Sequence, residues 1–411
     1  MSYAGDDVGA VVGDLGSTFF RYGNAGTALP DFSTASTLGH SSSSNSSSSA
    51  TSKSSSTFPR IGEVALYSQF DDVRFQNPFV GGALTHWEDV EQLWTYAFSD
   101  QALGLESRET PVVATAPSDL DQKGLAKYLE LLYETLEIPS GYVLRKAVAS
   151  SFAAGKTTSL VVDSGAQGTI ATTVCEGFVL HKTATRTMLG GDVLDSEVLK
   201  YIESTANAVV RPRFHFSKKR NAAGDVKVID IKLNVHDTVL QHHRLAIARD
   251  LKETHCSVPH TAYNEALANT VSPATYELPD GTKINLGTCR YVIPEMLMNP
   301  SKKSSLQGIP SLVLECLSKT PVDIRRETAS QILLAGGSTC FDGFSQRLNL
   351  ELTAKLSSVV KVRQHLPSKI ERKSSGFTGG SILASLGSFQ QLWVSKKQYD
   401  EGGAMVVANL L

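Results

Sequence analysis

The sequence predicts an α/β fold built from two related lobes. Two stretches share one pattern, in which an apolar strand ends in Asp-x-Gly and small hydroxylated residues follow: 11–18 and 160–169. Predicted strands and helices alternate around both stretches, which favours an α/β architecture. The length of 411 residues exceeds the size at which a single core usually stops growing, so two domains are expected.

The repeated pattern also indicates a ligand. An Asp-x-Gly hairpin can point its backbone N–H groups at a phosphate while the Asp faces a hydrated metal ion. A single copy is weak, because Asp-Gly pairs are common in ordinary turns. Two copies predict a two-lobed nucleotide binder with the ligand in the cleft, and they place Asp14 and Asp163 beside that ligand.

Composition disfavours several other classes. The net charge of −2 argues against a nucleic-acid binder driven by bulk charge. The five cysteines are scattered without C-x-x-C spacing, so neither a disulfide framework nor a zinc site is indicated, and a reducing compartment fits. Residues 1–7 lack the basic and apolar parts of a signal peptide, and no run of about twenty apolar residues predicts a membrane span.

Six elements follow from local pattern. Helices are predicted by apolar residues at helical spacing, strands by short apolar or alternating runs, and a hairpin by Pro279-Asp280-Gly281 between apolar flanks. The helices are expected over 83–100, 125–136 and 143–154, the strands over 111–117 and 226–235, and the hairpin over 276–286.

Two glycine-rich junctions are expected to open helices. The apolar run 332–335 leads into Gly336-Gly337, where a helix through Arg347 should begin and provide a seat for a phosphate or nucleoside. By itself the glycine pair is weak, because Gly-Gly also marks close packing. The stretch 379–386 should open an apolar helix that leads to Trp393.

Two polar segments remain. Residues 41–56 are mostly serine, and because they have nothing to bury we expect a disordered insertion over about 40–57. It is either a tolerated surface loop or a phosphorylatable tether. The stretch 211–220 interleaves cations with aromatics, which suits nucleic acid, an acidic histone-chaperone surface or a nuclear address. The near-neutral net charge favours a solvated loop before a strand instead.

Outside residues 30–75 and 205–250, the chain resembles the actin superfamily. Gly155-Lys156-Thr157-Thr158, 322–326 and the long run 379–399 are similar to actin itself. Both ends of the chain resemble the nuclear actin-related proteins, and among these the fourth class. The segments concerned are Gly5-Asp6-Asp7-Val8-Gly9-Ala10-Val11-Val12 and Asp400-Glu401-Gly402-Gly403.

The resemblance implies the actin-like ATPase fold: two related, ribonuclease H-like lobes around a central nucleotide cleft. The first lobe would comprise 1–153 with 375–411, and the second 154–374 with a small subdomain at about 190–303. The ligand would be ATP, with ADP as the alternative, and the cation Mg²⁺ or Ca²⁺. Asp14 and Asp163 would flank that cation and hold it through water.

The resemblance also assigns a set of nucleotide-contacting residues. They belong to the two Asp-x-Gly hairpins, to the nucleoside pocket and to the region beside the adenine. The set is Asp14, Gly16, Ser17, Thr18, Arg21, Lys146, Asp163, Gly165, Gln167, Gly168, Gly190, Lys252, Glu253, Gly336, Gly337, Phe341 and Lys373. For Lys252-Glu253 the alternative is a solvated pair on a helix.

The same resemblance exposes departures from hydrolytic chemistry. ATP hydrolysis needs a positioned water and a route for its proton. The positions that handle this water in actin hold Lys146, Ala166 and Ile170 here. Loss of one general acid–base group typically costs a factor of about 10²–10⁴ in rate, so hydrolysis should be very slow or absent. The Lys146 ammonium could partly replace the divalent cation; alternatively it points away from the cleft or pairs with a carboxylate.

The function implied is a structural subunit of chromatin-remodelling and histone-acetyltransferase complexes, found in the nucleus and partly in the cytoplasm. Its partners would be nuclear actin, a long helix of a remodeller ATPase or acetyltransferase scaffold, and histones, with no membrane. Homofilaments are not expected, because 301–307 is basic and polar where actin has an apolar plug. The alternative is a slow actin-like ATPase of the cytoskeleton; the actin-like run 379–399 argues against a sugar kinase or heat-shock chaperone.

Overall fold

The computed structural model describes residues 9–41, 59–68, 73–220, 226–264, 273–300, 305–358 and 360–409. Three predicted segments lie largely outside the described residues: 42–56 of the serine-rich tract, 301–304 of the filament segment, and the N-terminal resemblance segment up to Val8. Ser41, the first residue of the serine-rich tract, is the last residue of a strand. Within the part that is described, no helix is both long and apolar enough to cross a membrane.

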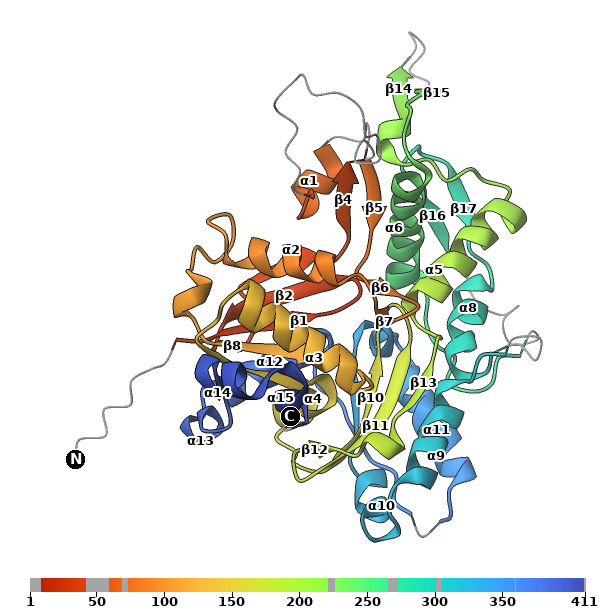
Figure 1. Cartoon of the computed structure of the whole chain (residues 1–411). Coiled ribbons are helices and arrows are strands. Elements are labelled where there is room, and N and C mark those ends of the chain that lie inside the picture. The colour runs from red at the N-terminus through yellow and green to blue at the C-terminus, as the bar shows by residue number, and fades with distance from the viewer. Residues whose placement is uncertain are drawn as a thin grey trace, which may run out of the picture.

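A six-stranded sheet forms the centre of one half of the molecule (Figure 1). Its order is β20-β9-β8-β1-β2-β3. The hairpin β1–β2 is antiparallel, whereas β8 and β9 run parallel to β1. The bounds are β1 Val11–Leu15, β2 Phe19–Asn24, β3 Phe32–Ala35, β8 Val112–Ala116, β9 Ser140–Arg145 and β20 Val394–Ser395.

The second sheet repeats this arrangement. Its order is β12-β11-β10-β18-β19, with β13 also paired to β11. Again an antiparallel hairpin, β10–β11, is followed by strands parallel to its first member. The bounds are β10 Ser159–Ser164, β11 Thr169–Cys175, β12 Phe178–Val179, β13 Thr185–Thr187, β18 Ile332–Ala335 and β19 Gln364–His365. The chain therefore contains one supersecondary unit twice.

Smaller hairpins and helices surround the sheets. The hairpins are β4 Leu38–Ser41 with β5 Val73–Gln76, β6 Phe79–Val80 with β7 Ala83–Leu84, β14 Phe216–Arg220 with β15 Val226–Asp230, and β16 Thr275–Glu277 with β17 Lys283–Asn285. The helices are α1 Glu63–Ser68, α2 Trp87–Phe98, α3 Gln122–Glu130, α4 Lys146–Ala153, α5 Gly191–Lys200, α6 Asp237–His255, α8 Cys289–Met298, α9 Ile309–Lys319, α10 Val322–Ala329, α11 Phe344–Lys355, α12 Lys369–Ala384, α13 Gly387–Gln390, α14 Lys396–Gly402 and α15 Ala404–Ala408.

Each sheet has its own apolar core, and a third cluster joins them. The two large clusters are centred on β1–β8 and on β10–β18. The joining cluster includes Ala149 of α4 and Phe377 of α12, which pack against each other. A Cβ on Gly379 would overlap the Ala149 carbonyl. Glycine at 379 therefore permits the close helix contact that holds the two halves together.

Four sequence predictions for single elements are confirmed. The helix over 83–100 is present as α2, the strand over 111–117 as β8, and the hairpin over 276–286 as β16–β17. The helix over 125–136 is present as α3 and a following π-helical turn, Leu131–Thr135. The strand over 226–235 is confirmed only as far as Asp230.

Three predictions are corrected. The helix over 143–154 begins at Lys146, because Val143 and Leu144 belong to β9 and pair with β8. The junction at Gly336 opens only a short 3₁₀ turn. The positive φ of Gly336 and Gly343 interrupts the chain there, and α11 begins at Phe344. The glycines at 379–380 lie inside α12 instead of opening it, and that helix ends at Ala384.

The predicted division of the chain into lobes stays a proposal. The sheet strands follow it closely, since β20 returns near the C-terminus to pair with β9. The boundary at 153–154 falls directly after α4, and the boundary at 374–375 falls inside α12. Both helices thus connect the two halves.

Candidate functional site

A cavity of about 470 Å³ lies between the two sheets. Two hairpin loops face each other across it: the first hairpin loop, Gly16–Phe19, joins β1 to β2, and the second hairpin loop, Gly165–Gly168, joins β10 to β11. The turn after β18 and the first half of α12 form a third side. All predicted nucleotide contacts except Gly190 line this cavity, so the fold brings together residues from six separate parts of the sequence: 14–21, 146, 163–168, 252–253, 336–341 and 373.

The strand that leads into the first hairpin loop, β1, carries the more heavily bonded carboxylate. Asp14 is 4% exposed. Its Oδ1 accepts hydrogen bonds from Thr115 Oγ1 at 2.6 Å and from Lys146 Nζ at 2.9 Å. Burial acts to raise the pKa of Asp14, but the charges of Lys146 and Arg21 and the Thr115 hydrogen bond outweigh it, and the pKa is lowered. Asp14 is therefore held as an ionised carboxylate.

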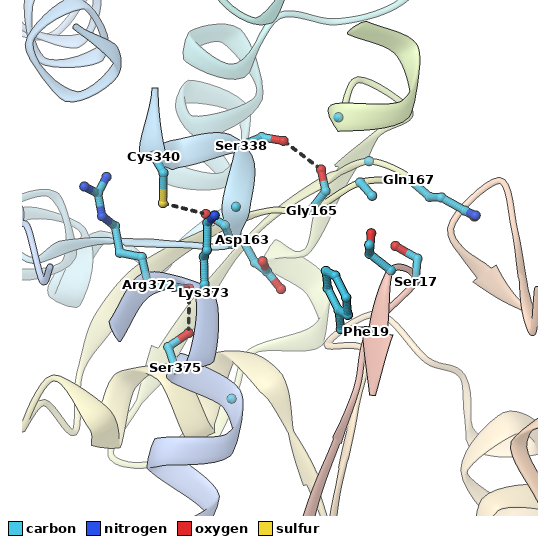
Figure 2. Close-up of a pocket in the computed structure, with 18 of the residues that line it drawn as sticks. Ser17, Phe19, Asp163, Gly165, Gln167, Ser338, Cys340, Arg372, Lys373 and Ser375 are labelled. Carbon is cyan, nitrogen blue, oxygen red and sulfur yellow. Dashed lines mark hydrogen bonds between the residues drawn. The ribbon is translucent and has the colours of Figure 1, made fainter. Parts of the chain in front are cut away.

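The second hairpin loop closes with the same backbone hydrogen bond as the first, and fewer charged side chains surround its Asp. The Gly165 N–H donates to the Gly168 carbonyl at 2.9 Å, as the Gly16 N–H does to Phe19. Opposite Asp163 stands the apolar Ile170. Burial raises the pKa of Asp163, and the Lys146 charge only partly opposes it. In Figure 2 the Asp163 carboxylate lies between the first hairpin loop and the helix that carries Lys373.

One glycine, Gly190, and one serine, Ser338, support the second hairpin loop from opposite sides. A Cβ on Gly190 would overlap backbone atoms of Gly165, Ala166 and Gly168. Gly190 thus supports the loop from behind and does not line the cavity. On the other side, Ser338 Oγ donates to the Gly165 carbonyl at 2.9 Å (Figure 2). The loop is braced from both sides before any ligand arrives.

The junction after β18 also depends on glycine. Gly336 has φ +84°, and a Cβ there would overlap the Ser164 carbonyl and approach Asp163 Oδ1 to 2.6 Å. Only glycine combines this conformation with so close an approach. Together with Gly337 and Phe341, it gives the cavity a wall of exposed backbone and one aromatic ring.

The two members of the predicted pair Lys252-Glu253 have different environments. Lys252 is 5% exposed, and its Nζ lies 2.6 Å from Asp195 Oδ1 and donates to the Gly191 carbonyl at 3.1 Å. It is not part of a solvated pair. Glu253 is exposed and lies 3.5 Å from Lys373 Nζ, across the outer end of the cavity. Exposed pairs of this kind contribute little to stability.

Sequence reasoning missed the acids that hold Lys252 in place. Asp195 is fully buried and also bonds Arg249 at 3.0 Å, while Asp192 bonds Arg249 at 3.2 Å. A signal for this network exists in the sequence. Two acids three residues apart face two bases three residues apart, which is the spacing that places side chains on one face of a helix.

Several contacts tie the two halves together around the cavity. Gln167 Oε1 accepts from the Gly82 N–H at 2.8 Å, so this side chain reaches across to the opposite half. Arg186 bonds Asp119 at 2.7 Å, and the sequence analysis did not single out either residue. Farther out, Thr238 Oγ1 of α6 accepts from the Phe75 N–H of β5 at 2.9 Å. The cavity is therefore closed by protein contacts on more than one side.

Two of the three positions that the sequence analysis named for water handling carry apolar side chains in this cavity. Ala166 and Ile170 both line it and offer no acid–base group, and the Lys146 ammonium is bonded to Asp14. Backbone N–H groups of the two hairpin loops suit phosphate oxygens. In the described part of the chain, no cluster of three or more His, Cys, Asp and Glu side chains is arranged to hold a metal ion.

The basic stretch 211–220 serves partly as structure. Arg211 bonds Asp230 at 2.9 Å and the buried Asp280 at 3.0 Å. The rest forms a 3₁₀ turn and then β14, whose hairpin with β15 projects from the molecule (Figure 1). The expectation of a loop ahead of a strand is thus met only for its first residues, because half of the stretch is itself strand.

A hairpin-and-sheet unit that occurs twice around a central cleft is the arrangement of the actin-like nucleotide-binding proteins. The family described as Actin matches residues 5–410. The chain belongs to the actin family, whose fold typically binds a nucleotide, and the fold class predicted from the sequence is confirmed.

Within that family the chain is similar to proteins named Actin-related protein 4. That of rice (Oryza sativa subsp. indica) is 34% identical over 98% of this chain and 99% of the relative. The protein of Arabidopsis thaliana is 33% identical over 98% of this chain and 99% of the relative. The protein of Schizosaccharomyces pombe is 29% identical over 98% of this chain and 96% of the relative. The resemblance to the fourth class of actin-related proteins is confirmed.

Proposed function

We propose that this chain is a nuclear actin-related structural subunit that binds ATP, or ADP, and hydrolyses it very slowly or not at all. One observation carries the proposal. The cleft keeps both hairpin loops that would hold phosphate, whereas its water-handling positions hold Lys146, Ala166 and Ile170. A site of this kind favours retention of a nucleotide over turnover.

A retained nucleotide would act as part of the structure. Its phosphates would lie between loops that belong to opposite halves, so binding requires those halves in one relative position. A ligand that binds only the native state stabilises it by mass action, by about 2.7 kcal/mol when its concentration is one hundred times Kd. The bound nucleotide therefore sets how the outer surfaces of the two halves face a partner.

Similarity to proteins named Actin-related protein 4 supports membership of chromatin-remodelling and histone-acetyltransferase complexes, with nuclear actin and histones as partners. A long scaffold helix would lie on the apolar surface near Gly155 and the C-terminal helices. Leu392 is 58% exposed there, beside Phe389 and Trp393 of the joining core. The protein would reside mainly in the nucleus, partly in the cytoplasm, and would form no homofilaments.

A single-turnover assay tests the absence of hydrolysis. The purified chain is loaded with γ-labelled ATP, and phosphate release is followed beside that of filament-free actin. We expect release slower by at least about 10²-fold, since more than one acid–base group is replaced. Release at the rate of actin would contradict the proposal and favour the cytoskeletal ATPase, as would pelleting of the protein as filaments.

Affinity purification from nuclei tests the partners. The tagged chain should recover remodeller or acetyltransferase subunits together with actin. Leu392→Glu should lose the scaffold protein but keep nucleotide binding, whereas Leu350→Glu, an equally apolar exposed position on α11 that is 53% exposed, should keep both. Recovery of cytoplasmic filament proteins alone would overturn the assignment.

A further inference from the structure

A cationic side chain stands beside Asp14 in the cleft. Lys146 is the first residue of α4, and its side chain is only 16% exposed. Its Nζ lies 2.9 Å from Asp14 Oδ1. It also lies 3.8 Å from the point where a Cβ on Gly16 would stand, so the ammonium sits directly beneath the first hairpin loop.

This placement fits a hydrated divalent cation poorly. Mg²⁺ requires near-octahedral oxygen ligands and keeps several of its waters, so it needs volume beside the carboxylate as well as charge. Here one oxygen of Asp14 already accepts hydrogen bonds from both Lys146 and Thr115. A second cation at this place would also be repelled by the ammonium.

The two carboxylates beside the hairpin loops have cationic side chains close to them without a metal ion. Two carboxylates, Asp14 and Asp163, face the cations Lys146 and Arg21, and both cations act electrostatically on both acids. Lys252 is not available for this role, because it is paired with Asp195. The chain thus supplies positive charge beside these carboxylates, where a metal ion would otherwise have to supply it.

The ammonium can serve the phosphates as well as the carboxylate. A Lys side chain carries three N–H donors, and the bond to Asp14 uses one of them. The others can reach phosphate oxygens held by the first hairpin loop, since Lys146 and the loop line the same cavity. A charged donor of this kind makes shorter and stronger hydrogen bonds than a neutral one.

We propose that the Lys146 ammonium takes the place of the divalent cation beside Asp14, so that a nucleoside polyphosphate binds this cleft without Mg²⁺ or Ca²⁺. The inference rests on the proposed nucleotide binding and adds the mode of charge compensation. It distinguishes this cleft from one in which the two carboxylates must be bridged by a hydrated metal.

The test is nucleotide affinity with and without chelator. The full chain is stripped of nucleotide, and a fluorescent ATP analogue is titrated in excess Mg²⁺ and in excess EDTA. Wild type should bind with the same Kd, within about threefold, in both buffers. Lys146→Gln should lose about tenfold or more on chelation, a difference equivalent to about 1.4 kcal/mol.

Two further variants separate charge from structure. Lys146→Arg keeps the positive charge and should keep binding in EDTA. Lys123→Gln removes an exposed lysine from α3 and should behave as wild type in both buffers. Circular dichroism shows whether Lys146→Gln folds. If it does not, Lys146→Met replaces it in the same titrations. A titration of wild type with Mn²⁺, followed by electron paramagnetic resonance, tests independently whether a divalent cation binds with the nucleotide. Wild type with bound nucleotide should retain no Mn²⁺.

The outcomes distinguish the two proposals. If chelator abolishes binding to wild type as fully as to Lys146→Gln, or if wild type retains Mn²⁺ with the nucleotide, the replacement of the cation is overturned and nucleotide binding stands. If neither buffer gives binding to the folded wild type, both proposals fall.

Discussion

The two hairpin loops share one closing hydrogen bond, but the charges around them differ. Each closes with a hydrogen bond of 2.9 Å between its first N–H and its last carbonyl, and each follows a strand whose last residue but one is a buried or half-buried Asp. Opposite Asp14 stands Arg21, whereas opposite Asp163 stands Ile170. The two units therefore share the closure of the loop, while the residues opposite the two Asp side chains differ in charge.

The difference shows in the two carboxylates. Burial works to raise the pKa of both. At Asp14 the neighbouring Lys146, Arg21 and Thr115 reverse that effect, and at Asp163 they do not. We infer that the residues around Asp14 provide most of the positive charge near the two carboxylates, and that the second hairpin loop mainly provides backbone shape.

The largest effect on the free energy of unfolding is expected when the Asp14–Lys146 pair is broken. Asp14→Asn would leave the Lys146 ammonium in a mostly buried position without its carboxylate, and removal of one partner from a buried pair typically costs about 3–5 kcal/mol. Asp163→Asn should cost far less, because burial already disfavours its charge. Urea denaturation of nucleotide-free protein measures both. The double variant Asp14→Asn/Lys146→Gln should recover part of the loss, and equal losses at Asp14 and Asp163 would refute the asymmetry.

A smaller effect is expected from the geometry of the second loop. Gly190→Val would drive a side chain into the loop backbone, and overpacking of this kind costs about 1–3 kcal/mol. The variant should also lose the increase in melting temperature that ATP gives wild type. Gly387→Ala, where a Cβ meets nothing within 4 Å, is the matched control. Unchanged stability of Gly190→Val would show that the loop can relax.

Acid titration should separate the two carboxylates further. The pKa of Asp163 is raised from its ordinary 3.8 in the folded state, so its contribution to stability is largest at low pH and is lost as pH rises through the folded value. The unfolding free energy of wild type relative to Asp163→Asn should therefore increase as pH falls. The lowered pKa of Asp14 moves its transition below 3.8, so the difference from Asp14→Asn should stay constant between about pH 7 and pH 5. The opposite assignment of the two trends would contradict the charge argument.

The smallest effect is expected at the outer end of the cavity. Lys373→Gln removes an exposed pair with Glu253 at 3.5 Å, and such pairs contribute about 0–1 kcal/mol. Stability should change little, and nucleotide affinity only a few-fold. A loss of affinity as large as that of an inner-cavity variant would move the main electrostatic contribution from the first loop to this end.

Local sequence pattern predicted the elements whose ends are marked by residues within the same short segment. Asp14 and Asp163 stand at the ends of apolar strands, and both strands are present as expected. Pattern failed where tertiary contacts decide. Val143 and Leu144 suit a helix or a strand equally, and the parallel pairing with β8 selects the strand. Gly379 looked like a helix opener and is a helix-packing position, because its neighbour is the Ala149 carbonyl of another helix.

The candidate site divides in the same way. Resemblance located the residues of both loops, but not Thr115, which meets Asp14 only because β8 lies beside β1. It also placed Lys252 in the nucleoside pocket without the acids that fix it. The two acids of α5 and the two bases of α6 have the same spacing, which could have indicated that they pair. The sequence, however, does not show that α5 and α6 pack against each other.

The sequence by itself determined the duplicated Asp-x-Gly units, the family and the absence of acid–base side chains at 166 and 170. These properties depend on residue identity and on contacts between near neighbours in the chain. The tertiary structure alone decided that Lys146 bonds Asp14, that Gly190 supports the second loop, and that Gln167 reaches the other half. Side-chain direction and charge pairing depend on which distant strands and helices pack together, and a linear pattern does not contain that information.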